Sequence, residues 1–203
     1  MSTPDTPSSK ATLTAETDPA GAQAAAAATA TKDHGIEFFG DGSHKTRGIE
    51  VGGGFSCSDI SMRRLLLMAA VSPAGSTDPV DVALKDSLRY RFKHGAPNAD
   101  IPAENFDPAK ERRYSLARIN DMKRTKMGES KNTLIARGDL ESVMNVAKPE
   151  RALRTLLRKN AQMAGSRGYR CLGVATATVD ENGKVSPFQM EGVVTVRPVG
   201  TGL

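Results

Sequence analysis

Two β-rich runs near the C-terminal end constrain the fold more than any other feature. The runs YRCLGVATATV (169–179) and VSPFQMEGVVTVRP (185–198) are rich in β-branched residues, and the DENGK segment between them is typical of a tight turn. Two strands joined by a short turn pair in antiparallel fashion. The sequence therefore predicts a β-hairpin at this end of the chain.

The first part of the globular region predicts strands followed by a helix pair. Two short strands, 35–39 and 47–51, are expected to end in a flexible turn at the glycines 52–54. Apolar residues at helical spacing then predict helices over 58–72 and 77–92.

The caps and the buried stripe of these helices can also be predicted. Ser58 and Thr77 are the expected N-caps, and Pro79 suits the first turn of the second helix. The buried stripe of the second helix is expected to comprise Val80, Ala83, Leu84, Ser87 and Leu88.

The middle of the chain predicts more strands and a second helix pair. The expected strands are ENF (104–106), RRYSLARI (112–119) and KNTLIAR (131–137), with a hairpin turn at GES (128–130). The expected helices are GDLESVMN (138–145) and PERALRTLLRKNAQMAG (149–165), the latter burying Ala152, Leu153, Leu156, Leu157 and Ala161, with Gly165 near its C-cap. This order predicts an α+β fold with a mainly antiparallel sheet flanked by helix pairs.

Residues 1–34 differ in composition from the rest of the chain. They are rich in Ala, Thr, Ser and Pro and contain the run AQAAAAATAT, so they lack the apolar side chains that a packed core requires. We therefore expect a disordered arm at 1–34 and one domain over 35–203.

Charge, cysteine content and hydropathy restrict the setting. The formal charge of +5 favours anionic partners but is small for a dedicated DNA-binding protein. Cys57 and Cys171 lie far apart without a metal-binding spacing, which indicates a reduced environment. The sequence has neither an apolar run of membrane-spanning length nor a signal peptide pattern, so a cytoplasmic protein without direct membrane insertion is expected. That location argues against an adhesion role for the Arg-Gly-Asp tripeptide at 137–139.

Four motifs in the same order and spacing resemble the nucleotide-binding (N) domain of P-type cation-transporting ATPases, over about 47–198. They are TDPVDVAL (77–84), ENFDPAKERR (104–113), LIARGDLESVM (134–144) and SRGYRCLGVATA (166–177). The last two resemble the family's Lys-Gly-Ala strand-to-helix corner and its Arg-Gly-x-Arg-x-Leu-x-x-Ala strand. The resemblance implies an N-domain-like fold.

The same resemblance implies an ATP site. Phe106 would stack on the adenine, Arg137 would replace the family's lysine, and Gly138 would let the backbone approach the ligand. Arg170 would reach the phosphates, and Asp81 would lie near the far side of the pocket. Glu111 stands where the family has a basic residue, so Arg112 takes that role only if the register shifts.

The resemblance also implies that catalysis has been lost. In HKT (44–46), which resembles the family's phosphorylation sequence, His44 stands where the family has its aspartate. Neither phosphoenzyme formation nor transport is expected, and no catalytic or metal-binding residues are predicted. ATP is thus expected as a ligand only.

Two alternatives to nucleotide binding stay open. The first is an interaction module that kept the N-domain fold but lost the ligand and docks on a membrane transporter or another assembly. The second, less favoured, is nucleic-acid binding through the basic region 110–137, which has few interleaved aromatic residues.

Overall fold

The computed structural model describes residues 35–39, 44–73, 75–92, 104–107, 113–119 and 132–199. The expected arm at 1–34, the expected turn at 128–130 and Arg112 lie outside these residues.

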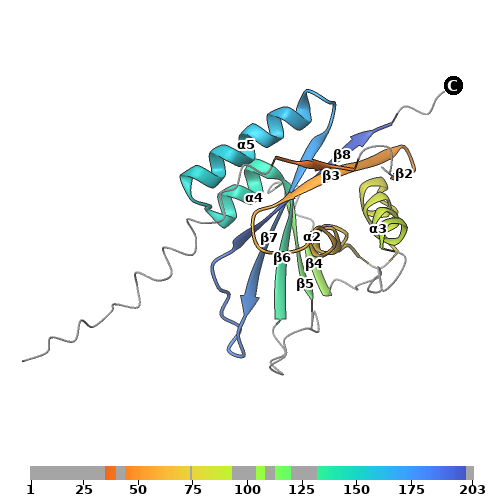
Figure 1. Ribbon diagram of the computed structural model, residues 1–203. Coiled ribbons are helices and arrows are strands. Elements are labelled where there is room, and N and C mark those ends of the chain that lie inside the picture. Colours follow the sequence, from red (N-terminus) through yellow and green to blue (C-terminus); the bar gives the residue numbers. More distant parts are fainter. Residues whose placement is uncertain are drawn as a thin grey trace, which may run out of the picture. The chain divides into compact units, whose positions relative to one another are not determined.

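An antiparallel sheet forms the centre of the fold (Figure 1). Its strands are β1 (Glu37–Phe38), β2 (His44–Thr46), β3 (Ile49–Ser56), β4 (Glu104–Asp107), β5 (Tyr114–Ile119), β6 (Asn132–Asp139), β7 (Arg170–Val179) and β8 (Gln189–Pro198). They are arranged in the order β1-β3-β8-β7-β6-β5-β4, and β2 also pairs with β3. The predicted C-terminal hairpin is confirmed as β7 and β8, which pair antiparallel across the turn that contains Gly183.

The two helix pairs cover opposite faces of this sheet (Figure 1). Helices α2 (Met62–Ala69) and α3 (Pro79–Arg91) cover the face that we call the α2–α3 face. Helices α4 (Leu140–Ala147) and α5 (Arg151–Gly165) cover the other, the α4–α5 face. Adjacent residues of one strand therefore enter different cores, because side chains alternate along a strand: Val194 packs with α2 and α3, and Val193 with α4.

The predicted α+β class and the order of helix pairs and strands are confirmed. The stripe predicted for the second helix is confirmed on α3, where Ala83, Leu84, Ser87 and Leu88 are buried and Val80 is half-buried. The prediction for the last helix was less accurate. Helix α5 buries Leu157 as predicted, and Leu153, Leu156 and Ala161 are half-buried against the core. Ala152 is exposed, and Asn160 and Ala164, which were not predicted, are buried.

The glycines 52–54 do not form the predicted turn. They continue β3, which runs from Ile49 to Ser56. A Cβ atom at Gly52 would collide with the ring of Tyr169, and one at Gly54 would lie 2.9 Å from the Sδ of Met62. The glycines are therefore explained by close packing on both faces of the strand rather than by a turn.

The two predicted N-caps were wrong by a few residues. Helix α2 is capped by Ser61, whose Oγ accepts a hydrogen bond from the amide of Arg64. Helix α3 is capped by Asp78, which accepts from the amides of Val80 and Asp81. Both replacements are strong N-cap residues one to three positions further along the chain.

Candidate functional site

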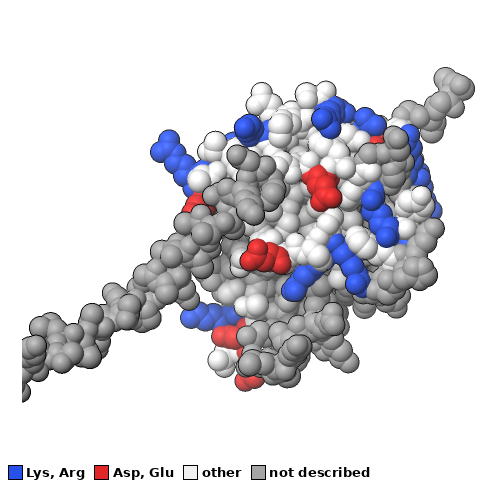
Figure 2. Space-filling model, viewed as in Figure 1, with Lys and Arg blue, Asp and Glu red and all other residues white. Residues whose placement is uncertain are grey.

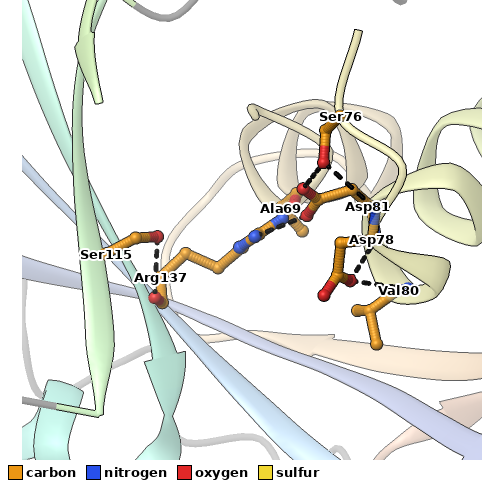
Figure 3. Close-up of polar contacts among 7 residues, drawn as sticks. All are labelled: Ala69, Ser76, Asp78, Val80, Asp81, Ser115 and Arg137. Atoms are coloured by element: carbon orange, nitrogen blue, oxygen red, sulfur yellow. Dashed lines mark hydrogen bonds and ion pairs between the residues drawn. The ribbon is translucent and has the colours of Figure 1, made fainter. Parts of the chain in front are cut away.

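Asp81 and Arg137 lie 56 positions apart in the sequence and contact each other directly (Figure 3). One Arg137 Nη2 hydrogen donates to Asp81 Oδ1 at 2.6 Å. The other end nitrogen, Nη1, donates to the backbone carbonyl of Ala69 at 2.7 Å. Ser76 donates its hydroxyl to Asp81 Oδ2 at 2.6 Å, so both oxygens of the carboxylate are used. We call these four residues the Asp81–Arg137 cluster.

Local structure explains why these residues meet. Asp81 lies in the first turn of α3, where a carboxylate interacts favourably with the helix dipole. Ala69 is the last residue of α2, so its carbonyl belongs to the group of helix-end acceptors that the helix itself leaves unpaired. Arg137 extends from β6 on the α2–α3 face and reaches both helix ends at once.

The Asp81–Arg137 ion pair is buried. Only 13% of the Arg137 side chain and 5% of the Asp81 side chain are exposed. The charge of Arg137 is therefore compensated inside the fold, and an incoming phosphate would have to compete with the Asp81 carboxylate for it.

Gly138 is required by packing against the neighbouring strand. A Cβ atom there would lie 2.5 Å from the Cα of Tyr114 in β5 and would also collide with the carbonyl of Arg113, the residue before that strand. On its other side Gly138 is paired with Gly173 of β7, and a Cβ at Gly173 would press on Val143 of α4. The two glycines let β5 and α4 approach the centre of the sheet closely.

The predicted strand-to-helix corner lies two residues later than expected. Strand β6 continues through Arg137 and Gly138 to Asp139, and α4 begins at Leu140. Asp139 is the N-cap, accepting hydrogen bonds from the amide and hydroxyl of Ser142. Arg137 and Gly138 are thus successive strand residues.

The remaining predicted site residues lie on neighbouring strands. Arg170 is exposed at the start of β7, four residues before Val174, which pairs with Arg137. Its position gives it the same side of the sheet as Arg137, about 13 Å further along. Phe106 lies in β4, the edge strand beyond β5, but its side chain is not among the described atoms. The structure thus brings Asp81 and Arg137 together and places Phe106 and Arg170 on strands to either side of them.

A buried glutamate cluster was not predicted. Glu50 in β3 accepts a hydrogen bond from the Tyr169 hydroxyl at 2.5 Å and two from the Arg197 guanidinium at 2.9 and 3.0 Å. Burial, followed by the hydrogen bond to Glu50, raises the pKa of Tyr169. The guanidinium groups of Arg197 and Arg167 lie 4.5 and 4.3 Å from the ring centres of Tyr169 and Phe38, respectively.

A second buried glutamate lies on β8. Glu191 accepts hydrogen bonds from the hydroxyls of Ser58 and Thr176, each at 2.6 Å. Burial, with a smaller contribution from the Glu191 charge, raises the pKa of the neighbouring Cys57 thiol to about 12. In the sequence, both glutamates stand inside runs of strand residues, and that interruption is the signal that would have marked them as buried polar groups.

Three other expectations concern metal binding, membrane insertion and the basic region 110–137. Among these residues, no group of three or more His, Cys, Asp or Glu side chains is arranged to hold a metal ion. No described helix combines the length and apolar character needed to cross a membrane. Of the basic region 110–137, the structure describes 113–119 and 132–137, in which the charge of Arg137 is already paired.

Comparison with known proteins gives no assignment. No protein-family model matches the chain, and no curated protein matches it.

Proposed function

We propose that this protein binds ATP or a related nucleotide without hydrolysing it. The observation that carries the proposal is the contact between Asp81 and Arg137, at 2.6 Å. The motif resemblance places these residues in one pocket, although 56 positions separate them in the sequence. The resemblance implied that Asp81 would lie near the far side of the pocket, whereas the two side chains are in direct contact. We take the proximity of the two motifs in the fold as support for a shared site.

The cluster also suggests how a nucleotide would be oriented. Arg137 is fixed by hydrogen bonds to Asp81 and to the end of α2, and its charge is compensated, so it would contribute a fixed planar group rather than a free cation. Arg170 is exposed and stands at the strand end, where a charge can approach phosphates freely. We therefore assign the base to the side of Arg137 and Phe106 and the phosphates to the side of Arg170.

An NMR titration of the full chain with ATP and adenosine tests this orientation. We expect backbone shifts around Asp81, Arg137 and Phe106 with both ligands, and dissociation constants on the order of 0.1 to several millimolar, typical of a shallow site. Arg170→Gln should weaken ATP binding by about tenfold and leave adenosine unchanged, because adenosine has no phosphate. Arg151→Gln, at an exposed position on α5, is the matched control and should bind both ligands like the parent.

The titration can also refute the proposal. Phe106→Ala should remove most binding of both ligands through loss of the stacking surface. If the parent shows no shifts with ATP at about ten millimolar, the chain is not a nucleotide-binding protein at useful affinity. If ATP binds but neither variant changes its affinity, the nucleotide occupies a different site.

The absence of turnover forms a separate part of the proposal. At the position where the related pumps form their phosphorylated aspartate, this chain has His44, which has no carboxylate to accept a phosphoryl group. Incubation with ATP labelled in the γ-phosphate should give no acid-stable phosphoprotein and no phosphate release above background. Labelling within residues 40–50 would contradict this expectation.

The interaction-module alternative is favoured by one observation. Ala69 and Asp81 accept the hydrogen bonds of Arg137 inside the fold, and Ser76 donates to Asp81. The closeness of Tyr114 explains the glycine at 138, so these residues have structural reasons to be present without a ligand. In that case the chain would dock on a transporter or another assembly. An NMR spectrum typical of a folded protein that shows no shifts on addition of ATP would favour this alternative.

A further inference from the structure

Basic residues from four segments lie at one end of the sheet. They are Lys45 in β2, Arg47 in the β2–β3 turn, Arg167 in the turn after α5, and Arg170 at the start of β7. We call these four residues the basic end.

Strand register places them together. Lys45 is paired with Glu50, and Glu50 is paired with Arg197 of β8. Arg170 is paired with Val196, the residue before Arg197, so it lies at the same end of the sheet but on the face opposite to Lys45. Arg47 precedes Gly48, whose carbonyl accepts a hydrogen bond from the amide of Val199 at 2.7 Å. The basic end therefore extends across β2, β3, β8 and β7, which corresponds to about 14 Å at the usual strand spacing.

In the part of the chain that the structure describes, no acidic side chain neutralises the charges of the basic end. All four side chains are exposed, and within the described residues none of them makes an ion pair or a side-chain hydrogen bond. The acidic residue closest in register, Glu50, is buried and already paired with Arg197. Figure 2 shows mostly basic side chains on the surface near the start of β7 and the end of β8.

We propose that the basic end binds the phosphate backbone of a nucleic acid. Three of its four residues are arginines, whose planar donors match phosphate oxygens. A width of about 14 Å is enough to contact two or three successive phosphates of one strand. This surface is separate from the basic region 110–137 and from the Asp81–Arg137 cluster, and it shares only Arg170 with the proposed nucleotide site.

The surroundings favour a nucleic acid over an acidic protein. Protein interfaces have an apolar centre, whereas backbone binding requires only cations. In the described part of the chain, the large apolar side chains that are exposed are Tyr90, Met163 and Val185, in α3, α5 and the β7–β8 turn. The basic end contributes none of them.

The aromatic residues nearby indicate binding without base recognition. Arg167 covers one face of the Phe38 ring, and Arg197 covers one face of the Tyr169 ring. The Tyr169 ring is also packed against Gly52 of β3. Because these rings are engaged within the protein, bases have no stacking platform there, and duplexes should bind at least as well as single strands.

Fluorescence anisotropy with the full chain tests the proposal. The probes are a duplex of about 20 base pairs, a single strand of the same length, and poly-glutamate as an acidic polypeptide, between about 50 and 200 mM salt. We expect duplex binding with a slope of log affinity against log salt of about −2 to −3, corresponding to two or three phosphates. Equal binding of poly-glutamate, or no duplex binding at about 50 mM salt, would overturn the assignment.

A charge-matched pair of variants locates the binding surface. The test variant combines Lys45→Glu, Arg47→Glu and Arg167→Glu, and Arg170 is left intact because the nucleotide proposal uses it. The control combines Arg151→Glu, Lys159→Glu and Lys184→Glu at exposed positions on α5 and the β7–β8 turn, with the same change in net charge.

The two variants should differ clearly. We expect the test variant to lose at least about tenfold in duplex affinity and most of its salt dependence, and the control to stay within about threefold of the parent. Circular dichroism must show both variants folded. Equal losses in both would indicate a general charge effect and refute the basic end, as would a loss found only on substituting Lys123, Arg124 and Lys126 in the region 110–137.

Discussion

Arg137 and Gly138 are neighbours in the sequence that act on opposite faces of β6. The Arg137 side chain joins the ends of α2 and α3, whereas the missing Cβ of Gly138 leaves space for β5. Side chains alternate along a strand, so the two residues cannot line one wall with both side chains. Each residue therefore needs its own test.

Gly138→Val should destabilise the protein whether or not a nucleotide binds. The new side chain would collide with the backbone of Arg113 and Tyr114, at a cost of about 3 kcal/mol or more. Urea unfolding of the variant measures this loss. Gly165→Ala is the control, because nothing lies within 4 Å of its Cβ position, and in a helix it should stabilise by about 0.5 kcal/mol. A Gly138→Val protein as stable as the parent would contradict the packing explanation.

Both cysteines should be poorly reactive in the folded protein. Burial raises the pKa of Cys57 to about 12 and that of Cys171 to about 11. Because the thiolate is the nucleophile, alkylation by iodoacetamide near neutral pH should be at least about tenfold slower than that of the urea-unfolded chain. Mass spectrometry of the two sites gives the rates. Rapid labelling of Cys57 in the folded state would show that its surroundings open.

At the scale of elements, the Asp81–Arg137 cluster connects three segments that are distant in the sequence. It ties β6 to the C-terminal end of α2 and the N-terminal end of α3. Removing one partner from a buried ion pair leaves an uncompensated charge, which is more damaging than the loss of the pair itself. The cluster should therefore behave as one unit.

A double-mutant cycle measures this coupling. Asp81→Ala and Arg137→Ala should each destabilise by about 3 kcal/mol, and the double variant should be far less destabilised than the sum, in urea unfolding. The exposed bidentate pair of Arg158 and Glu141, between α5 and α4, is the comparison and should show a much smaller effect on Glu141→Gln. Additive effects at Asp81 and Arg137 would refute the coupling.

The end of α4 offers a stabilising substitution. Lys148 is its C-cap and has a left-handed backbone with φ of 47°, a conformation that favours glycine. Lys148→Gly should raise the free energy of unfolding by about 0.5 to 1 kcal/mol, measured by thermal unfolding. The same change at exposed Lys184, for which no positive φ is found, should not stabilise.

On the scale of the whole molecule, one sheet separates two apolar cores, and both cores have polar groups beside them. Cys57 and Cys171 belong to the margin of the α4–α5 core, and Tyr169 borders the same core and binds Glu50. The pKa values of all three groups are raised in the fold, chiefly by burial. The free energy of unfolding should therefore depend on pH in the alkaline range, where these groups lose their protons.

The protein should lose stability as the pH rises above about 9. These groups ionise at their usual pKa values in the unfolded chain but at higher values in the fold, so their contribution is complete below about pH 9 and is lost as the pH rises toward 12. We expect a loss of roughly 3 kcal/mol by about pH 10.5, measured by urea unfolding. A Cys57→Ala, Cys171→Ala variant should lose less over the same range. An identical pH profile for both proteins would refute the assignment to the thiols.

Local patterns in the sequence were enough to predict most elements of the fold. Helical spacing and turn residues identified both helix pairs and the β7–β8 hairpin, because these signals depend on neighbours a few positions apart. The errors at the glycines 52–54 and at the caps Ser58 and Thr77 have a different origin. Gly52 and Gly54 are explained by Tyr169 and Met62, and the Ser58 hydroxyl is directed to Glu191, which are contacts that no local pattern contains.

For the candidate site, too, some features could be predicted from the sequence and others only from the tertiary structure. The sequence by itself selected Asp81, Arg137 and Gly138 as notable, from residue type and motif order. Only the tertiary structure showed that Asp81 pairs with Arg137 and that Gly138 faces β5. The buried Glu50 with its partners Tyr169 and Arg197, and the gathering of cations at the basic end, likewise depend on strand register. Register is set by the packing of the entire sheet, so residues more than a hundred positions apart become neighbours only when the chain has folded.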